Sequence, residues 1–217
     1  MYKRQVYIVG YTDGTFGPSR SMTRAEAAAI FARLLAEKNG DTISTAANTK
    51  FADIPAHAWY SGYVKYLSNN GITYGKSKTV FAPNDAITRA EFTTMAVRFF
   101  DVYGDGDAEI MEQFSGFNDV SSGYWAAEYI KYAALHGWIN GYGDGSFHAD
   151  REINRAEVVT IVNRLLGRGA DEGYIADNLR KLNTFPDVTK RHWAYYAVME
   201  AANAHTAVLG ESESWSK

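Results

Sequence analysis

The sequence contains no cysteine, and this absence removes several kinds of chemistry at once. Without cysteine the chain cannot form disulfides, thiolate metal sites or a cysteine nucleophile, although the compartment in which it works stays undetermined. The chain also has no run of about 18 apolar residues, the length needed to cross a bilayer. Its most apolar stretch, residues 27–35, is interrupted by Arg33. We therefore expect neither a disulfide scaffold nor a membrane-spanning helix.

Little in the composition points to nucleic-acid binding or catalysis. With 22 basic against 25 acidic residues the net charge is −3, whereas nucleic-acid binding needs a basic surface. The five histidines are scattered without the spacing of a zinc site, and no nucleophile-elbow or phosphate-loop motif is present. The Asp-Gly loops do not place oxygens at alternate positions ending in Glu, as a calcium loop requires. Paired carboxylates stay open, because any fold brings some together. Otherwise we predict no catalytic residue, no metal site and no cofactor.

What the sequence does contain is one five-residue pattern that occurs three times. The copies are residues 22–26 (M-T-R-A-E), 87–91 (I-T-R-A-E) and 153–157 (I-N-R-A-E). In each, Thr or Asn is followed three residues later by Glu and then by an apolar run, which is typical of a helix start closed by a capping box. We therefore predict three helices with N-caps at Thr23, Thr88 and Asn154, and we interpret the three Glu residues as structural caps.

Capping does not explain the arginine in each box, at Arg24, Arg89 and Arg155. At the first helical position a cation faces the positive end of the helix dipole, which is unfavourable by ~0.3–1 kcal/mol when exposed. One interpretation is a surface cation that pairs with a neighbouring carboxylate and contributes only ~0–1 kcal/mol. We favour the other, that each arginine holds an anionic ligand, because helix N-termini bind anions and arginine holds a carboxylate in a fork.

The boxes belong to a longer repeat, since the three arginines recur at intervals of 65 and 66 residues. Eight residues before each arginine is a phenylalanine: Phe16, Phe81 and Phe147. Residues 10–16 (G-Y-T-D-G-T-F) and 141–147 (G-Y-G-D-G-S-F) form a turn before it, whereas residues 75–81 lack the Tyr and the Asp-Gly. Each unit also has a Phe-x-Asp opening followed by a Trp. The openings begin at Phe51, Phe117 and Phe185, and the tryptophans are Trp59, Trp125 and Trp193.

Together these blocks resemble the S-layer homology (SLH) family, whose unit reads roughly F-x-D-V, W-A, A-x-x-x-G-x-I-x-G-Y-x-D-G-x-F-x-P, I-T-R-A-E. Residues 117–166 carry nearly all of it in order. The resemblance implies a non-catalytic anchoring module outside the cell, at the bacterial cell wall or S-layer. In this family, grooves between neighbouring units bind secondary cell-wall polymers, often through a pyruvylated sugar whose carboxylate meets the T-R-A-E arginine. The implied partners are cell-wall polysaccharide or a peptidoglycan-linked polymer and other S-layer subunits, with no nucleic acid and no membrane insertion.

The resemblance also implies a mainly α fold, a pseudo-threefold array of helix-loop-helix units around a central three-helix bundle. Apolar periodicity independently predicts a helix in the first half of each unit and another after each box, and strand signals are few. We expect the C-terminal half of repeat 1 at 1–40, repeat 2 at 51–101, repeat 3 at 117–168 and the N-terminal half of a fourth unit at 185–207. The last helix should extend to about His205. In a pseudo-threefold arrangement the fourth half-unit packs with repeat 1 and closes one domain.

Carried onto this chain, the resemblance makes Arg24, Arg89 and Arg155 the anion-binding residues. The groove-lining candidates are Trp59, Trp125, Trp193, Gly10, Tyr11, Gly141 and Tyr142. Each of these tryptophans is equally well interpreted as a packing anchor or as a flat surface for a sugar ring. The two tyrosines line a groove or simply pack. The aspartate of each opening is expected to cap or close the turn before the first helix.

Two departures from the family pattern affect these expectations. Repeat 2 lacks the Tyr and the Asp-Gly, so we expect its site to be weak or silent. Residues 1–5 lead directly into residues 6–10 without a signal-peptide cleavage site, so we expect a truncated product that begins half-way through a repeat. Two other functions stay open: a structural module for protein–protein assembly in a surface layer, and the anchoring fragment of a surface enzyme whose catalytic domain is missing.

Overall fold

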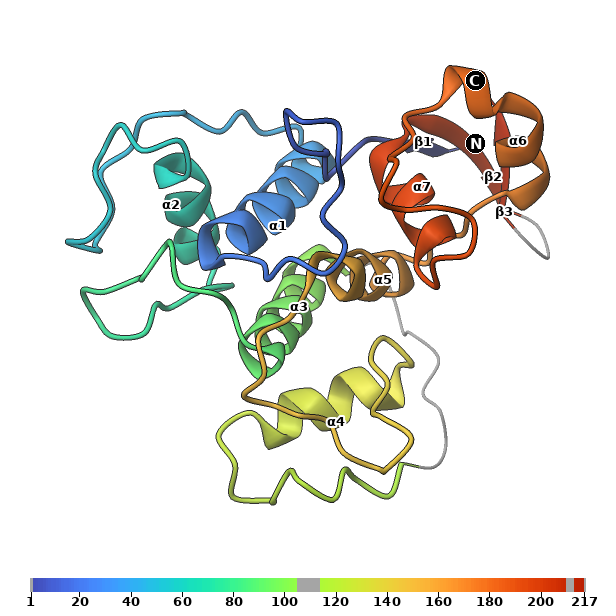
Figure 1. Cartoon of the computed structure of the whole chain (residues 1–217). Helices are drawn as coiled ribbons and strands as arrows, with labels where there is room; N and C mark the ends of the chain where they lie inside the picture. The colour runs from blue at the N-terminus through green and yellow to red at the C-terminus, as the bar shows by residue number, and fades with distance from the viewer. Residues whose placement is uncertain (1, 105–113, 210–212, 217) are drawn as a thin grey trace. The chain divides into compact units, whose positions relative to one another are not determined.

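The computed structural model describes residues 2–104, 114–209 and 213–216, which are mainly helical as predicted (Figure 1). The helices are α1 (Arg24–Asn39), α2 (Ser61–Asn69), α3 (Arg89–Tyr103), α4 (Ala127–Leu135), α5 (Arg155–Leu165), α6 (Glu172–Asn178), the 3-10 helix η1 (Leu179–Lys181) and α7 (Tyr195–Ala202). The strands are β1 (Tyr2–Arg4), β2 (His205–Leu209) and β3 (Glu213–Ser216). The chain divides into a central unit, Ser21–Ile153, and a terminal unit, Met1–Arg20 with Asn154–Lys217.

All three predicted capping boxes are confirmed. In the first, the Thr23 hydroxyl accepts the Glu26 N–H at 3.2 Å, and the Glu26 carboxylate accepts the Thr23 N–H at 2.8 Å. The same reciprocal pair closes the starts of α3 and α5. Each box satisfies two of the backbone N–H groups that a helix start leaves without partners, so α1, α3 and α5 begin where the sequence predicts.

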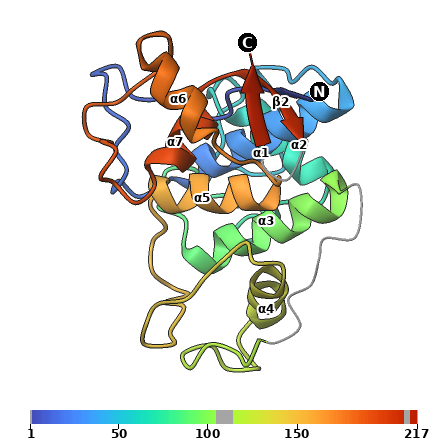
Figure 2. The ribbon, with the colours of Figure 1, turned by 90° about the vertical axis from the view of Figure 1, so that its right-hand side faces the viewer.

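In the central unit, α1 packs on α2 and α3 packs on α4, while α1 also contacts α3. Figure 2 shows α4 beneath α3. The predicted apolar stripes form this core: Phe31 of α1 lies 5.3 Å from Phe92 and 4.9 Å from Phe99 of α3, measured between ring centroids. Burying each of these rings contributes about 1.5–3 kcal/mol, so the aromatic contact is a main stabilising feature of the unit.

The residues two places before the box arginines hydrogen-bond to one another in a closed cycle within the central unit. The Ile87 N–H donates to the Met22 carbonyl at 2.9 Å, Met22 donates to Ile153 at 3.0 Å, and Ile153 donates to Ile87 at 3.0 Å. The side chains of all three are fully buried. The segments that lead into the three boxes therefore meet at one point.

The terminal unit combines helices with a three-stranded antiparallel sheet in the order β1-β2-β3. Within it α5 packs on α7, and α6 contacts β3. Its strands come from both ends of the sequence, β1 from the beginning and β2 and β3 from the end (Figure 1). The sequence did not predict the sheet, because three-residue β1 is too short to show a strand pattern.

The prediction that the last helix extends to about His205 is wrong. Helix α7 ends at Ala202, and its C-cap Asn203 is extended, with φ −127° and ψ 122°. The Asn203 side chain donates to the Met199 carbonyl at 3.0 Å, which satisfies an acceptor that the next helical turn would have used. His205 then begins β2.

Candidate functional site

The aspartate of each Phe-x-Asp opening accepts two backbone N–H groups from the loop that precedes a box. We call this arrangement the clamp. In repeat 3 the Asp119 carboxylate accepts the N–H groups of Phe147 and His148, both at 2.7 Å. Partial burial raises the pKa of Asp119, but the two N–H donors outweigh burial and hold the pKa below its usual value. The expected role before the first helix is therefore wrong: the carboxylate binds a loop 28 residues further along the chain. Two backbone N–H groups without other partners bind a carboxylate more strongly than a turn whose own hydrogen bond is already formed.

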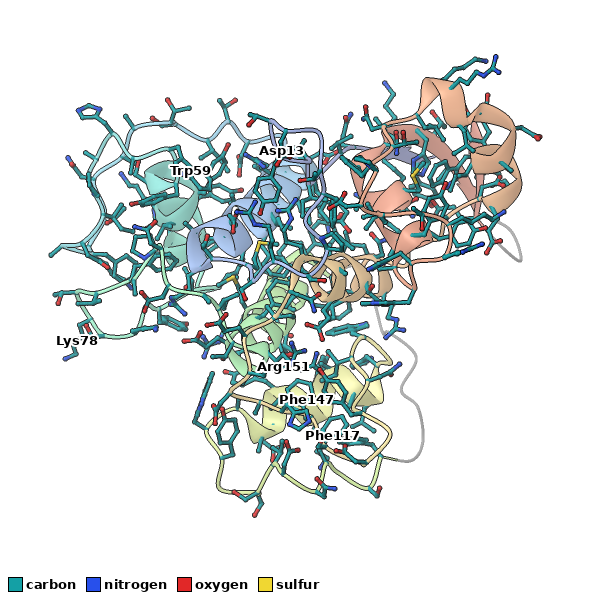
Figure 3. All side chains as sticks on the ribbon, in the orientation of Figure 1. Asp13, Trp59, Lys78, Phe117, Phe147 and Arg151 are labelled. Carbon is teal, nitrogen blue, oxygen red and sulfur yellow. The ribbon has the colours of Figure 1, made fainter. Side chains whose placement is uncertain are left out.

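Each turn begins with a glycine because the phenylalanine of the opening packs closely against its backbone. The rings of Phe117 and Phe147 stack with centroids 5.1 Å apart, as Figure 3 shows. A Cβ added at Gly141 would lie 2.4 Å from Cε1 of Phe117 and 2.6 Å from the Ser146 carbonyl oxygen. Gly141 thus has a packing role, whatever it contributes to a groove.

The terminal unit contains the same clamp, assembled from the two ends of the chain. Asp187 accepts the N–H groups of Phe16 and Gly17 at 2.9 and 2.7 Å. Phe185 packs on Phe16 at 5.3 Å between centroids, and a Cβ on Gly10 would lie 2.5 Å from Phe185 Cε1. Residues 185–187 thus form with residues 10–17 the same contacts that Asp119 and Phe117 form with the loop of repeat 3.

The three box arginines are buried, with 4–5% of each exposed, so the interpretation as surface cations is wrong. Each Nε donates to the carbonyl of a repeat phenylalanine. The pairs are Arg24–Phe81 at 2.7 Å, Arg89–Phe147 at 2.9 Å and Arg155–Phe16 at 2.8 Å. The Nη2 atoms of Arg89 and Arg155 also donate to the carbonyls of Asn140 and Val9. The arginines thus link successive repeats: the box of one binds the loop of the next.

Arg24 also meets an anion that belongs to the chain. Its Nη1 lies 3.0 Å from Oε1 of Glu91, whose Oε2 accepts the Thr88 N–H in the capping box. One carboxylate thus caps α3 and neutralises the guanidinium. This internal pair explains why a cation is tolerated at the start of α1. An external carboxylate at Arg24 would share it with Glu91.

A cleft of about 100 Å³ opens beside Arg24 in the central unit. Its lining comes from three repeats: Arg24 from repeat 1, Tyr74, Gly75 and helix α3 from repeat 2, and Trp125 from repeat 3. Thr94 lines it too, and its buried hydroxyl has no hydrogen-bond partner among the described residues. The structure thus brings together Arg24 and Trp125, two of the sequence-predicted site residues.

The three tryptophans of the repeats lie just before helices α2, α4 and α7, and all three are exposed. The exposed fractions are 53% for Trp59, 56% for Trp125 and 65% for Trp193. Figure 3 labels Trp59 beside α2. Their interpretation as packing anchors is wrong, because an anchor would be buried. Exposed indole faces are available for stacking.

Tyr11 and Tyr142 lie against the box arginines. The Arg155 guanidinium lies 4.7 Å from the Tyr11 ring centroid, and the Arg89 guanidinium lies 5.3 Å from that of Tyr142. The Tyr142 hydroxyl also accepts a hydrogen bond from Arg151, labelled in Figure 3. Repeat 2 has Lys76 at this position, and Lys76 pairs with Asp85 at 2.7 Å.

Sequence reasoning missed most residues of the cleft, among them Tyr74, Thr94 and Arg98. Arg98 donates to the Tyr129 hydroxyl at 3.2 Å and lies over the Tyr74 ring at 4.7 Å. The sequence did contain a signal for two of them. Thr94 and Arg98 follow Glu91 by three and seven positions, so they lie on the same face of α3.

A comparison with protein families shows the family of the chain. The profile of the S-layer homology domain family matches residues 1–28, 50–93 and 116–159, which is more than half of the chain. The chain therefore belongs to the S-layer homology domain family. Among the residues that the structure describes, no helix is both long and apolar enough to cross a bilayer.

Several curated proteins of known name are similar to this chain. Cell surface glycoprotein 1 of Acetivibrio thermocellus is 34% identical over 219 residues, which cover 97% of this chain and 9% of that protein. The cellulosome-anchoring protein of the same organism is 32% identical over 208 residues, covering 95% of this chain and 44% of that protein. Its exoglucanase XynX is 33% identical over 159 residues, covering 73% of this chain and 14% of that enzyme. The chain thus spans less than half the length of each.

Proposed function

We propose that this chain is a non-catalytic anchoring module that binds an acidic secondary cell-wall polymer in the grooves between its repeats. Family membership and similarity to a cell surface glycoprotein and a cellulosome-anchoring protein support a place at the bacterial cell surface. The similarity to exoglucanase XynX covers 14% of that enzyme, so it favours an attachment role over a catalytic one.

The observation that carries this proposal is the cleft formed by three repeats. The exposed Trp125 indole offers a flat face to a sugar ring, while Arg24 and Arg98 offer positive charge beside it. The cleft has a volume of about 100 Å³. Such a cleft admits a small acidic substituent, such as a pyruvyl group, while the sugar itself stays on the surface. The Thr94 side chain also lines the cleft.

The other predicted site residues extend the same proposal to two further grooves. Arg89 with Gly141 and Tyr142, and Arg155 with Gly10 and Tyr11, reproduce the pairing of a buried arginine with a glycine turn. Trp59 and Trp193 are exposed like Trp125. We assign these residues to grooves of the same type. The cleft at Gly75 supports a ligand site there, although repeat 2 lacks the Tyr and the Asp-Gly.

The pseudo-threefold arrangement and the closure of one domain belong to this proposal too. The hydrogen-bond cycle through Met22, Ile87 and Ile153 supports a common axis for the three boxes. The clamp between Asp187 and the loop of repeat 1 supports completion of repeat 1 (1–40) by the fourth half-unit (185–207), alongside repeats 2 (51–101) and 3 (117–168).

Sedimentation with purified cell walls tests the function. The chain should co-sediment with intact walls and should stay in solution after the secondary polymer has been extracted. Trp125→Ala should weaken co-sedimentation at least about 5-fold, because a stacked aromatic contributes ~1–3 kcal/mol. Tyr2→Ala is the matched control, because Tyr2 and Trp125 are each 56% exposed and Tyr2 lies outside the cleft. Equal binding to extracted walls would favour the assembly module instead.

A further inference from the structure

The terminal unit contains a buried cluster of three side chains that bind metals in other proteins. Glu200 lies near the end of α7, His205 begins β2 and Glu213 begins β3. Their side chains are 0%, 2% and 3% exposed, and one ligand atom from each lies within 4.8 Å of the others. All three lie outside the residues that the family profile matches.

His205 is oriented so that one ring nitrogen faces both carboxylates. Its Nδ1 lies 3.0 Å from the Asn203 carbonyl oxygen, which accepts but cannot donate, so Nδ1 carries the proton of the neutral ring. The lone pair of Nε2 then faces Oε2 of Glu200 and Oε1 of Glu213, each at 3.3 Å. Trp215 stacks on the ring, with centroids 3.8 Å apart, and fixes its plane. In metal-binding histidines the ring nitrogen that does not bind the metal usually donates a hydrogen bond to a carbonyl or carboxylate, which fixes the orientation of the ring.

The two carboxylates differ in their other contacts. Oε2 of Glu213 accepts hydrogen bonds from Arg4 at 3.2 Å and from the Gly169 N–H at 3.3 Å, so only Oε1 faces His205. Neither oxygen of Glu200 has a hydrogen-bond partner in the part of the chain that the structure describes. A buried carboxylate without hydrogen bonds needs a cation or a proton beside it.

We propose that Glu200, His205 and Glu213 bind one divalent metal ion of the zinc class, which ties the end of α7 to the strands β2 and β3. In a tetrahedral site with metal–ligand bonds of about 2.0–2.1 Å, the ligand atoms lie about 3.3 Å apart. The two measured separations from Nε2 are 3.3 Å each. An imidazole with two carboxylates suits zinc better than calcium or magnesium, which take oxygen ligands.

The rival account places a proton, not a metal, between these groups. Arg4 and Arg168 act electrostatically on Glu200 and lower the need for a further cation. Neither arginine hydrogen-bonds to Glu200 among the described residues, however. A protonated Glu200 would use one oxygen to donate to Nε2 and would leave Oε1 of Glu213 facing the same lone pair. The two accounts differ in whether the purified chain takes up metal.

Titration of the full chain with Zn²⁺ after chelator treatment and dialysis separates the two accounts. Calorimetry should show uptake of one equivalent. At 100-fold excess over Kd the metal should raise Tm by roughly 5 °C or more, and chelator should reverse the shift. Cobalt(II), which replaces zinc, should give the visible absorption of a tetrahedral site, and adding zinc should abolish it.

Matched variants assign the metal to the cluster. Glu200→Gln keeps the shape of the side chain and should lower zinc affinity by more than about 100-fold. Glu172→Gln and His57→Gln change exposed residues of the same types and should leave zinc affinity unchanged. If Glu200→Gln does not fold, the cobalt spectrum of the unaltered chain and the shift of a buried histidine ring nitrogen in NMR decide. Absence of stoichiometric uptake, or undiminished uptake by folded Glu200→Gln, would overturn the proposal in favour of the proton.

Discussion

The same clamp is built in two ways in this protein, and the comparison separates what residues determine from what chain connectivity determines. In the central unit Asp119 binds Phe147, which follows it by 28 residues. In the terminal unit Asp187 binds Phe16, which precedes it by 171 residues. The N···O distances are 2.7 and 2.9 Å, so the geometry is the same. The residue pattern therefore specifies the clamp, whether its two parts are close in the sequence or far apart.

Connectivity affects the free energy of forming each clamp. Loop-closure entropy grows with the logarithm of the separation, so joining residues 16 and 187 costs roughly 1.5 kcal/mol more than joining residues 119 and 147. The terminal unit offsets this cost with contacts that the central clamp lacks. These include the pairing of β1 with β2 and the hydrogen bond from the Tyr7 hydroxyl to the Val159 carbonyl.

Removing residues 184–217 tests the comparison most severely. The deletion removes Asp187, α7, β2 and β3 together, and it exposes buried side chains such as Tyr7 and Val158. At ~1.5–3 kcal/mol for each large apolar side chain, the terminal unit should lose its fold. Hydrogen exchange should show lost protection in α5, whereas the Asp119 clamp of the central unit should keep its protected N–H groups. Unchanged protection in α5 would contradict the account.

Single substitutions at the two aspartates compare the clamps directly. Asp187→Ala and Asp119→Ala each remove two N–H···carboxylate bonds, and each should lower the free energy of unfolding by about 2 kcal/mol. Chemical denaturation measures both values. The terminal variant should also loosen the contact between β1 and β2, because residues 1–20 are then held less firmly. If Asp119→Ala lowers the free energy of unfolding and Asp187→Ala does not, the terminal clamp does not stabilise the chain.

The dependence of stability on pH in acid tests the contribution of Asp119 to the central clamp. The folded-state pKa of Asp119 lies below the model-compound value of 3.8, so its contribution is present above that value. The contribution is lost as pH falls through the lower folded pKa. Asp119→Asn should therefore destabilise the chain at pH 7 and should show a shallower decline in Tm below about pH 4. Parallel acid curves for the two proteins would contradict this assignment.

A smaller effect is expected at the residue that follows each repeat phenylalanine. This residue has positive φ in all three clamps: 67° at Gly17, 58° at Ala82 and 54° at His148. A left-handed conformation costs an L-residue roughly 1–2 kcal/mol, and glycine avoids the cost. Ala82→Gly should therefore raise the free energy of unfolding by up to about 1 kcal/mol. Ala58→Gly, at a position without positive φ, should not.

Much of this structure could be predicted from the sequence, because its signals are local. The capping boxes at Thr23, Thr88 and Asn154 depend on residues three apart, and each is confirmed. The clamp partners of Asp53, Asp119 and Asp187 could not be predicted, because one carboxylate suits a nearby turn and a distant loop equally well. The sheet was missed because its strands are short, and because β1 lies at the other end of the chain from β2 and β3.

The candidate site shows the same limit. The pattern places Arg24 and Trp125 in separate repeats, and only folding brings them to one cleft. The burial of the arginines follows from the phenylalanine carbonyls that they bind, and no sequence pattern reveals a backbone acceptor. Glu91 shows one residue in two roles, cap and counter-ion, of which the sequence indicated only the cap.

Binding of the extracted wall polymer before and after removal of its acidic substituents tests the central claim most directly. The unaltered chain should bind the intact polymer and should lose at least about 10-fold in affinity once those substituents are removed, because a charge-assisted hydrogen bond contributes ~1.5–3 kcal/mol. Trp125→Ala should bind both preparations weakly. Equal affinity of the unaltered chain for both preparations would contradict recognition of an acidic group in the inter-repeat cleft.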